Sequence, residues 1–226
     1  EPGGVYRPFF PPPALEKRRK FLLCAEKPET AFWMARFYPL KPPKPMEITH
    51  IGHIRTDPNP EVGGGKQFVF TVASPEFPQS HQIPVMVQET SEGFKLDWVA
   101  YVEFRDDFLL KFASNYRPEP GRFHVGIKRA HYFDNDVPDL DSKHCFVLQP
   151  PQEHYEVASF VPVDSTLAEA LTRVITWDTQ IVYVIADLQW RKSGDFEWIE
   201  LIGVPQMNWY SKPKPTAPSQ GGSPSN

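Results

Sequence analysis

Residues 93–104 read Gly-Phe-Lys-Leu-Asp-Trp-Val-Ala-Tyr-Val-Glu-Phe, and apolar side chains recur there at every second position. In an extended chain, one face would carry Phe94, Leu96, Trp98, Ala100, Val102 and Phe104, and the other face Lys95, Asp97, Val99, Tyr101 and Glu103. A period of two is typical of a β-strand with one buried face. We therefore predict a strand over residues 94–104, joined to the preceding strand by a short turn at residues 91–93.

The rest of the first half predicts helices followed by an antiparallel sheet. Helical spacing of apolar residues covers residues 14–25 and 28–38, and Pro39 is expected to end the second helix. Alternating patterns then predict strands at residues 46–56, 67–73 and 82–90, with a glycine-rich loop at residues 58–65. A short helix is expected at residues 108–113, after two aspartates that favour a helix N-terminus.

The pattern restarts after residues 118–121, Pro-Glu-Pro-Gly, which we interpret as a domain boundary. Strands are predicted at residues 123–133, 145–148, 156–162, 180–190 and 197–204. A helix separates the third strand from the fourth; Thr166 and Glu169 have capping-box spacing, and the expected buried stripe is Leu167, Leu171, Val174 and Ile175. The predicted fold class is therefore α+β: an N-terminal domain at residues 14–116, a small five-stranded barrel at residues 121–211, a proline-rich entry segment at residues 1–13 and a disordered tail at residues 212–226.

Composition narrows the function classes. The 226 residues hold 24 Lys and Arg against 28 Asp and Glu, a net charge of −4, which disfavours a dedicated nucleic-acid binder. The sequence lacks an apolar run long enough to span a membrane. Cys24 and Cys145 cannot build a disulfide framework, and we expect two buried free thiols. The chain starts at Glu1, so we expect a removed upstream piece; an N-terminal anchor there, and hence a cytoplasmic or membrane-tethered location, stays open.

Two stretches of the chain carry resemblances. The hairpin ending in residues 93–98, Gly-Phe-Lys-Leu-Asp-Trp, resembles the late sheet of the cone-shaped nuclear transport factor two-like (cystatin-like) fold, which includes ketosteroid isomerases and the SnoaL group. The chain is also similar to uncharacterised two-domain proteins of planctomycete and verrucomicrobial type, a resemblance that implies no activity. The stretches that carry it are residues 18–21, 27–29, 96–98 and 160–165. The element order of the second half resembles an oligonucleotide/oligosaccharide-binding (OB) barrel.

Asp97 and Tyr101 are the candidate catalytic residues. On a strand, both side chains would lie on one face. The resemblance to ketosteroid isomerases implies that an acidic base removes a proton next to a carbonyl while a tyrosine hydroxyl stabilises the developing oxyanion. Ketosteroid isomerase is a well-known example of an active site with shifted carboxyl pKa values. The alternative is that both belong to the polar outer face of an antiparallel sheet. The pattern offers no second acidic oxyanion donor. An enzyme would need this face to line an enclosed pocket.

Metal and cofactor sites are not predicted. His50 and His53 would point to opposite faces of a strand, and so would the neighbours His144 and Cys145. The acidic loop at residues 134–141 lacks the glycine and the glutamate of an EF-hand, so a solvated loop is the better interpretation. The glycine run at residues 63–65 lacks phosphate-loop spacing.

Aromatic residues make up 14% of the chain, with six tryptophans. Trp190 and Trp198 lie in the last two predicted strands, where they either fill the barrel or offer stacking surfaces for a ligand. From the sequence we expect a non-catalytic structural or protein-interaction module. The alternatives are a small-molecule-binding or isomerase/lyase-like protein that uses Asp97 and Tyr101, and oligosaccharide or single-strand binding by the barrel.

Overall fold

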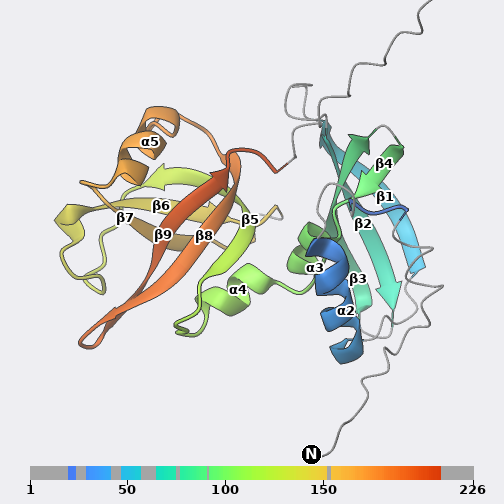
Figure 1. Ribbon diagram of the computed structural model, residues 1–226, viewed down its shortest axis with the longest axis horizontal. Coiled ribbons are helices and arrows are strands. Elements are labelled where there is room, and N and C mark those ends of the chain that lie inside the picture. Colours follow the sequence, from blue (N-terminus) through green and yellow to red (C-terminus); the bar gives the residue numbers. More distant parts are fainter. Residues whose placement is uncertain are drawn as a thin grey trace, which may run out of the picture.

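The computed structural model describes residues 20–23, 29–41, 47–56, 65–74, 77–90, 92–151 and 154–209. These residues form an α+β protein with two sheets, shown side by side in Figure 1. A four-stranded sheet with helices α2 (Glu29–Leu40) and α3 (Trp98–Arg105) makes up the N-terminal unit, and five strands with helix α5 (Thr166–Val174) make up the barrel. The predicted segments at residues 1–13 and 212–226 lie outside the described residues, as do Cys24 and most of the loop at residues 58–65.

The first sheet has the simple strand order β1-β2-β3-β4 with antiparallel pairing throughout. Its strands are β1 (Glu47–Thr56), β2 (Gly65–Ser74), β3 (Phe77–Thr90) and β4 (Gly93–Leu96). The first three confirm the strands expected from alternation, although β3 begins earlier than predicted. Gly93 follows the turn between β3 and β4 with φ of 98°, a left-handed backbone that glycine adopts without a steric penalty.

The strand predicted over residues 94–104 is wrong beyond its first three residues. Strand β4 stops at Leu96, and helix α3 (Trp98–Arg105) follows directly. Asp97 starts the helix as its N-cap: its Oδ1 accepts hydrogen bonds from the backbone amides of Val99 (3.1 Å) and Ala100 (3.2 Å). This side-chain oxygen satisfies amides that a helix N-terminus otherwise leaves unpaired, so the aspartate stabilises the start of the helix at Trp98.

The alternation within α3 arises because the helix is buried on two sides. Trp98 and Val102, one turn apart, pack against Met34 of α2 (Glu29–Leu40). Ala100 and Phe104, also one turn apart, pack toward the barrel. Two i, i+4 stripes offset by two residues place apolar side chains at every even position, which imitates the period of a strand.

The N-terminal helices are confirmed in part. Helix α2 covers residues 29–38 of the predicted helix, and Pro28 lies outside the described residues. Pro39 lies inside the last turn of α2 rather than beyond its end. Of the helix predicted at residues 14–25, the structure describes residues 20–23, and these form a turn and an isolated bridge from Leu22 to Leu96. The backbone amide of Leu96 donates to Phe21 and that of Leu23 donates to Leu96, so this short segment pairs with β4 instead of forming a helix.

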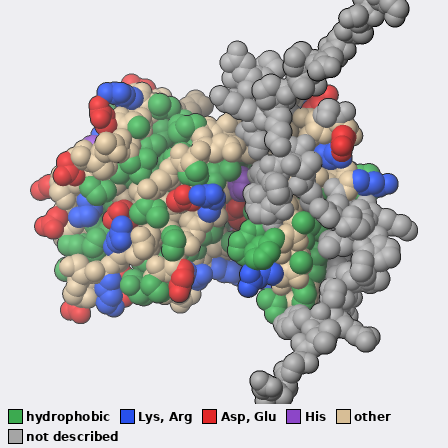
Figure 2. Space-filling view, viewed as in Figure 1, with side chains coloured by type: hydrophobic (Ala, Val, Ile, Leu, Met, Phe, Trp, Pro, Cys, Tyr) green, Lys and Arg blue, Asp and Glu red, His purple; other side chains and the backbone are tan. Residues whose placement is uncertain are grey.

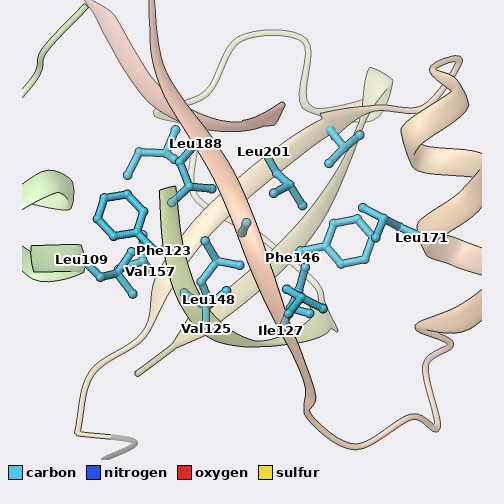
Figure 3. Close-up of a cluster of buried hydrophobic side chains, with 14 of the residues drawn as sticks. Leu109, Phe123, Val125, Ile127, Phe146, Leu148, Val157, Leu171, Leu188 and Leu201 are labelled. Atoms are coloured by element: carbon cyan, nitrogen blue, oxygen red, sulfur yellow. The ribbon is translucent and has the colours of Figure 1, made fainter. Parts of the chain in front are cut away.

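The second half forms a closed barrel with the order β5-β6-β7-β9-β8. Its strands are β5 (Gly121–Ala130), β6 (Lys143–Gln149), β7 (Val157–Pro162), β8 (Val182–Ser193) and β9 (Phe196–Gln206), with a short 3-10 turn η2 (Leu140–Ser142) before β6. All five strands and the helix between the third and fourth were expected in this order. Figure 3 shows the barrel core, in which Phe146, Leu148, Leu188 and Leu201 are almost fully buried.

Helix α5 (Thr166–Val174) differs from its prediction in two details. Ser165 is the N-cap, and its hydroxyl accepts a hydrogen bond from the amide of Ala168 (3.1 Å), so the predicted capping box of Thr166 and Glu169 is wrong. Leu171 and Ile175 are buried as expected, but Val174 is 52% exposed. The buried stripe is therefore Ala168, Leu171 and Ile175, whose spacing of three and four residues places them on one face of the helix.

The two units meet along α3, β5 and the residues after β9. Trp209 is buried there against Met86, Ala100, Phe104 and Ile185. Its Nε1 donates to the carbonyls of Val184 (2.9 Å) and Val125 (3.2 Å), so the polar atom of the indole is satisfied by the barrel backbone. Helix α4 (Phe108–Ala113) connects the units, and its Leu109 and Phe112 join the barrel core.

Candidate functional site

A cleft of about 1060 Å³ lies between the N-terminal unit and the barrel. Helices α2, α3 and α4 line one side, and strands β5, β8 and β9 line the other. Figure 2 shows hydrophobic side chains beside Lys and Arg side chains where the two units meet. A concave, mainly apolar site of this size with a few polar groups is typical of ligand binding.

The wall from the N-terminal unit is aromatic and partly exposed. Trp33 and Leu40 of α2 line the cleft with 51% and 78% of their surface exposed. Beneath them Phe37 and Trp98 pack edge to face, with ring centroids 5.5 Å apart. The indole Nε1 of Trp98 donates to the hydroxyl of Tyr38 (2.8 Å), so this polar atom is satisfied within the wall. A ligand on this side would therefore meet apolar ring surface.

The barrel wall holds a cross-strand ion pair. Arg122 of β5 faces Asp187 of β8 and donates two hydrogen bonds to its carboxylate, from Nε (2.6 Å) and from a terminal nitrogen (2.8 Å). This bidentate geometry fixes both side chains at the cleft. Ile202 and Pro205 of β9 continue the wall with apolar surface.

Glu103 and His124 also line the cleft and join the two units. One carboxylate oxygen of Glu103 accepts the backbone N–H of His124 (2.7 Å), and the other shares a hydrogen bond of 2.9 Å with Nδ1 of the imidazole. Both residues are 5% exposed. Because the carboxylate is bonded to a main-chain and a side-chain group of one residue, it fixes the position of α3 relative to β5.

Burial changes the acidity of this pair. Removal from water raises the pKa of Glu103, and the neighbouring His124 opposes the shift because a positive imidazole favours the carboxylate. The other ring nitrogen of His124, Nε2, makes no hydrogen bond to the described residues and lies 3.8 Å from Oδ2 of Asp97. That distance exceeds a hydrogen bond, so the Asp97 carboxylate lies beside the imidazole without being hydrogen-bonded to it.

The structure places the predicted pair Asp97 and Tyr101 one turn apart at the start of α3, not along a strand. Asp97 is buried and caps the helix, while Tyr101 is half-buried with the guanidinium of Arg105 5.7 Å from its ring. Burial raises the pKa of Tyr101, and Arg105 opposes the shift. Neither residue is among those that line the cleft.

Trp190 and Trp198 are both partly buried. Trp190 packs on the barrel core, and its Nε1 donates to the carbonyl of Phe112 in α4 (2.8 Å). Trp198 packs on a separate cluster around Cys145 and Phe160, and Lys143 lies over its ring at 5.5 Å. They are not direct cross-strand partners, since Trp190 pairs with Ile199 and Trp198 with Arg191. The structure therefore does not combine them into one aromatic surface.

The other candidate groups remain separate. Within the described ranges, His, Cys, Asp and Glu side chains do not gather in any group of three or more suited to a metal ion. Cys145 is a buried free thiol, and burial raises its pKa to about 11. The helices that the structure describes include none long and apolar enough to cross a membrane.

Sequence reasoning missed the residues that matter most in the cleft. Glu103 was predicted on the polar face of a strand, and His124 attracted no expectation. Neither carried a distinctive signal, because a single titratable residue between two apolar neighbours, as in Val-Glu-Phe at residues 102–104 and Phe-His-Val at residues 123–125, is also the ordinary pattern of a half-buried strand. A titratable group surrounded by core residues needs a buried partner, but the sequence does not say which one.

Comparison with known proteins covers families, curated sequences and solved structures, and no family model, curated protein or solved structure matches this chain.

Proposed function

We propose that this chain is a non-catalytic small-molecule-binding module whose ligand occupies the cleft between the N-terminal unit and the barrel. The observation that carries the proposal is that exposed apolar side chains from both units line one cleft. Trp33 and Leu40 come from α2, Phe108 from α4 and Ile202 from β9. Water contact with these side chains is unfavourable, and a ligand that covers them would gain roughly 25 cal/mol for each Å² of apolar surface removed from water.

A binding role suits the polar groups of the cleft better than catalysis does. Glu103 is bonded to His124, and Asp187 is bonded to Arg122. Groups held in this way act as fixed dipoles that orient a ligand. An isomerase or lyase based on Asp97 and Tyr101 would need both side chains to reach one substrate, yet Asp97 is engaged with the amides of α3.

A protein-interaction module is the second candidate. Leu40 is 78% exposed at the end of α2, and Phe32 on the same helix is 54% exposed. Together with Trp33 they give α2 an apolar outer surface that a partner segment could cover while it entered the cleft. The same cleft variants test this function, with a peptide in place of a small molecule.

At the level of fold, we propose that the barrel is OB-like. Numbered from β5, its strands have the order first, second, third, fifth, fourth, and a helix lies between the third and the fourth. This order supports the assignment because a five-stranded Greek-key barrel with those connections defines the OB fold. Ligand binding by Trp190 and Trp198 and a cone-like N-terminal unit stay predictions, and the cleft proposal uses neither.

The test is a fluorescence titration with the neutral apolar dye Nile red, excited directly. We expect saturable binding of one dye per chain with a blue-shifted emission. Ile202→Trp adds bulk to the cleft and should weaken binding by about tenfold, because the larger side chain occupies space that the dye would otherwise fill; a tenfold loss corresponds to about 1.4 kcal/mol. The matched control is Ile51→Trp, at an exposed isoleucine of β1 that does not line the cleft. Equal weakening by both variants, or binding without saturation, would refute the proposal.

A further inference from the structure

Five of the side chains that line the cleft are titratable, and four of them are already paired with one another. Arg122 is bonded to Asp187, and Glu103 is bonded to His124. The fifth is Arg36, an exposed residue of α2. Its guanidinium has no carboxylate partner among the described residues. Its guanidinium lies 4.9 Å from the ring centroid of Phe32, an aromatic contact that leaves its charge uncompensated.

From this arrangement we infer that the cleft binds an organic monoanion, a carboxylate on an aromatic body, with its charged end at Arg36. The inference rests on the proposed function and adds the chemical class of the ligand. A planar guanidinium matches a carboxylate with two parallel N–H···O bonds, and a charged hydrogen bond is roughly twice as strong as a neutral one. A cationic ligand would instead meet Arg36 with like charge.

The aromatic body follows from the neighbours of Arg36. Trp33 and Phe37 lie on the same helix, Trp98 on α3 and Phe108 on α4, and all four line the cleft. Phe37 and Trp98 already pack edge to face. An aromatic ring of the ligand could therefore pack against the edge of one of these rings or the face of the other. The hydrophobic and basic side chains that adjoin at the boundary in Figure 2 agree with a ligand that is apolar at one end and charged at the other.

The experiment compares two probes that differ in the charged group: 2-naphthylacetate and the neutral 2-(2-naphthyl)ethanol. Binding of each probe is measured by isothermal titration calorimetry, because naphthyl groups absorb and emit in the same range as tryptophan. For the wild-type chain we expect the acid to bind about tenfold more tightly than the alcohol, and added salt to weaken the acid alone.

Substitutions at Arg36 separate the charge from the cleft. Arg36→Gln should remove the preference for the acid over the alcohol. Arg36→Lys should restore part of that preference, because lysine supplies a point charge without the paired N–H donors of a guanidinium. The matched control is Arg173→Gln, at an exposed arginine of α5 that pairs with Glu169 and does not line the cleft. It should change neither affinity.

Two results would overturn the inference. If the wild-type chain binds acid and alcohol equally and Arg36→Gln changes neither, the ligand is not an anion held by Arg36. Saturable Nile red binding that Ile202→Trp weakens would then still support the cleft as a binding site. If Arg36→Gln and Arg173→Gln weaken the acid to the same extent, the preference reflects overall charge, and the assignment to Arg36 is wrong.

Discussion

Glu103 and His124 form two hydrogen bonds, of 2.7 and 2.9 Å, across the boundary between helix α3 and strand β5. This buried contact lies at the cleft and fixes the positions of its two walls relative to each other. The N-terminal unit and the barrel are thus joined twice, by the chain through α4 and by these two hydrogen bonds. Because hydrogen bonds weaken steeply with distance and angle, the second connection allows little movement of α3 relative to β5. The stability of the junction and the shape of the cleft are therefore coupled.

Removal of the Glu103 carboxylate should strongly destabilise the chain. Glu103→Ala leaves the amide and the imidazole of His124 buried without this partner, which costs about 3–5 kcal/mol. Glu103→Gln keeps an oxygen for the amide and should cost less. Urea denaturation measures both, with Glu169→Ala, at an exposed residue of α5, as a control expected within about 0.5 kcal/mol of wild type. A loss for Glu103→Ala no larger than that of the control would show that the contact does not hold the junction.

Trp209 should be equally important for the junction. It is 1% exposed, contacts both units and donates its Nε1 to two barrel carbonyls. Trp209→Ala should lower the free energy of unfolding by about 3–5 kcal/mol, because it removes a large buried ring and leaves a cavity. The control is Trp177→Ala, since Trp177 is half exposed on the barrel. Similar losses for both variants, measured by thermal unfolding followed by circular dichroism, would contradict this role.

Asp97 should contribute to stability as a helix cap. Asp97→Ala removes the acceptor for the amides of Val99 and Ala100 and should cost about 0.5–2 kcal/mol. Asp97→Asn keeps a capping oxygen and should remain close to wild type. Urea denaturation of both variants measures these losses of unfolding free energy. If Asn is as damaging as Ala, the charge near His124 matters more than the cap.

Asp106 should make stability depend on acid pH. Burial acts to raise the pKa of its carboxyl, but the hydrogen bonds from Arg105 and Lys41 outweigh burial and lower it below the ordinary 3.8. Stabilisation from a group with a lowered pKa is complete above the unfolded-state pKa and is lost as the pH falls through the folded-state pKa. The difference in unfolding free energy between wild type and Asp106→Asn should therefore be constant between pH 7 and about pH 5 and shrink below about pH 4.

Denaturation in urea at pH 7, 5, 4 and 3 measures that difference. The control is Asp178→Asn, at an exposed aspartate after α5 that makes no ion pair with the residues the structure describes. If the difference for Asp106→Asn grows as the pH falls, the sign is wrong and the contacts of Arg105 and Lys41 do not stabilise the carboxylate.

The strands of the barrel could be predicted because their patterns are local. Each apolar run is bounded by turn residues, and the order of three strands, a helix and two strands follows from the chain alone. The error in α3 has a physical cause: a helix buried on two sides shows apolar side chains at every second position, as a half-buried strand does. The capping side chain of Asp97 distinguishes the two, and its hydrogen bonds form only once the chain turns.

The sequence by itself determined an α+β chain with an antiparallel sheet followed by five strands and a helix, because hydrophobic period and turn residues act within a few positions of one another. Only the tertiary structure decided that Glu103 of α3 is hydrogen-bonded to His124 of β5 and that Trp209 is buried between the two units. It also decided that Trp33, Arg36 and Ile202 line one cleft. Those contacts join residues far apart in the chain. They depend on how complete elements pack, which no local pattern encodes.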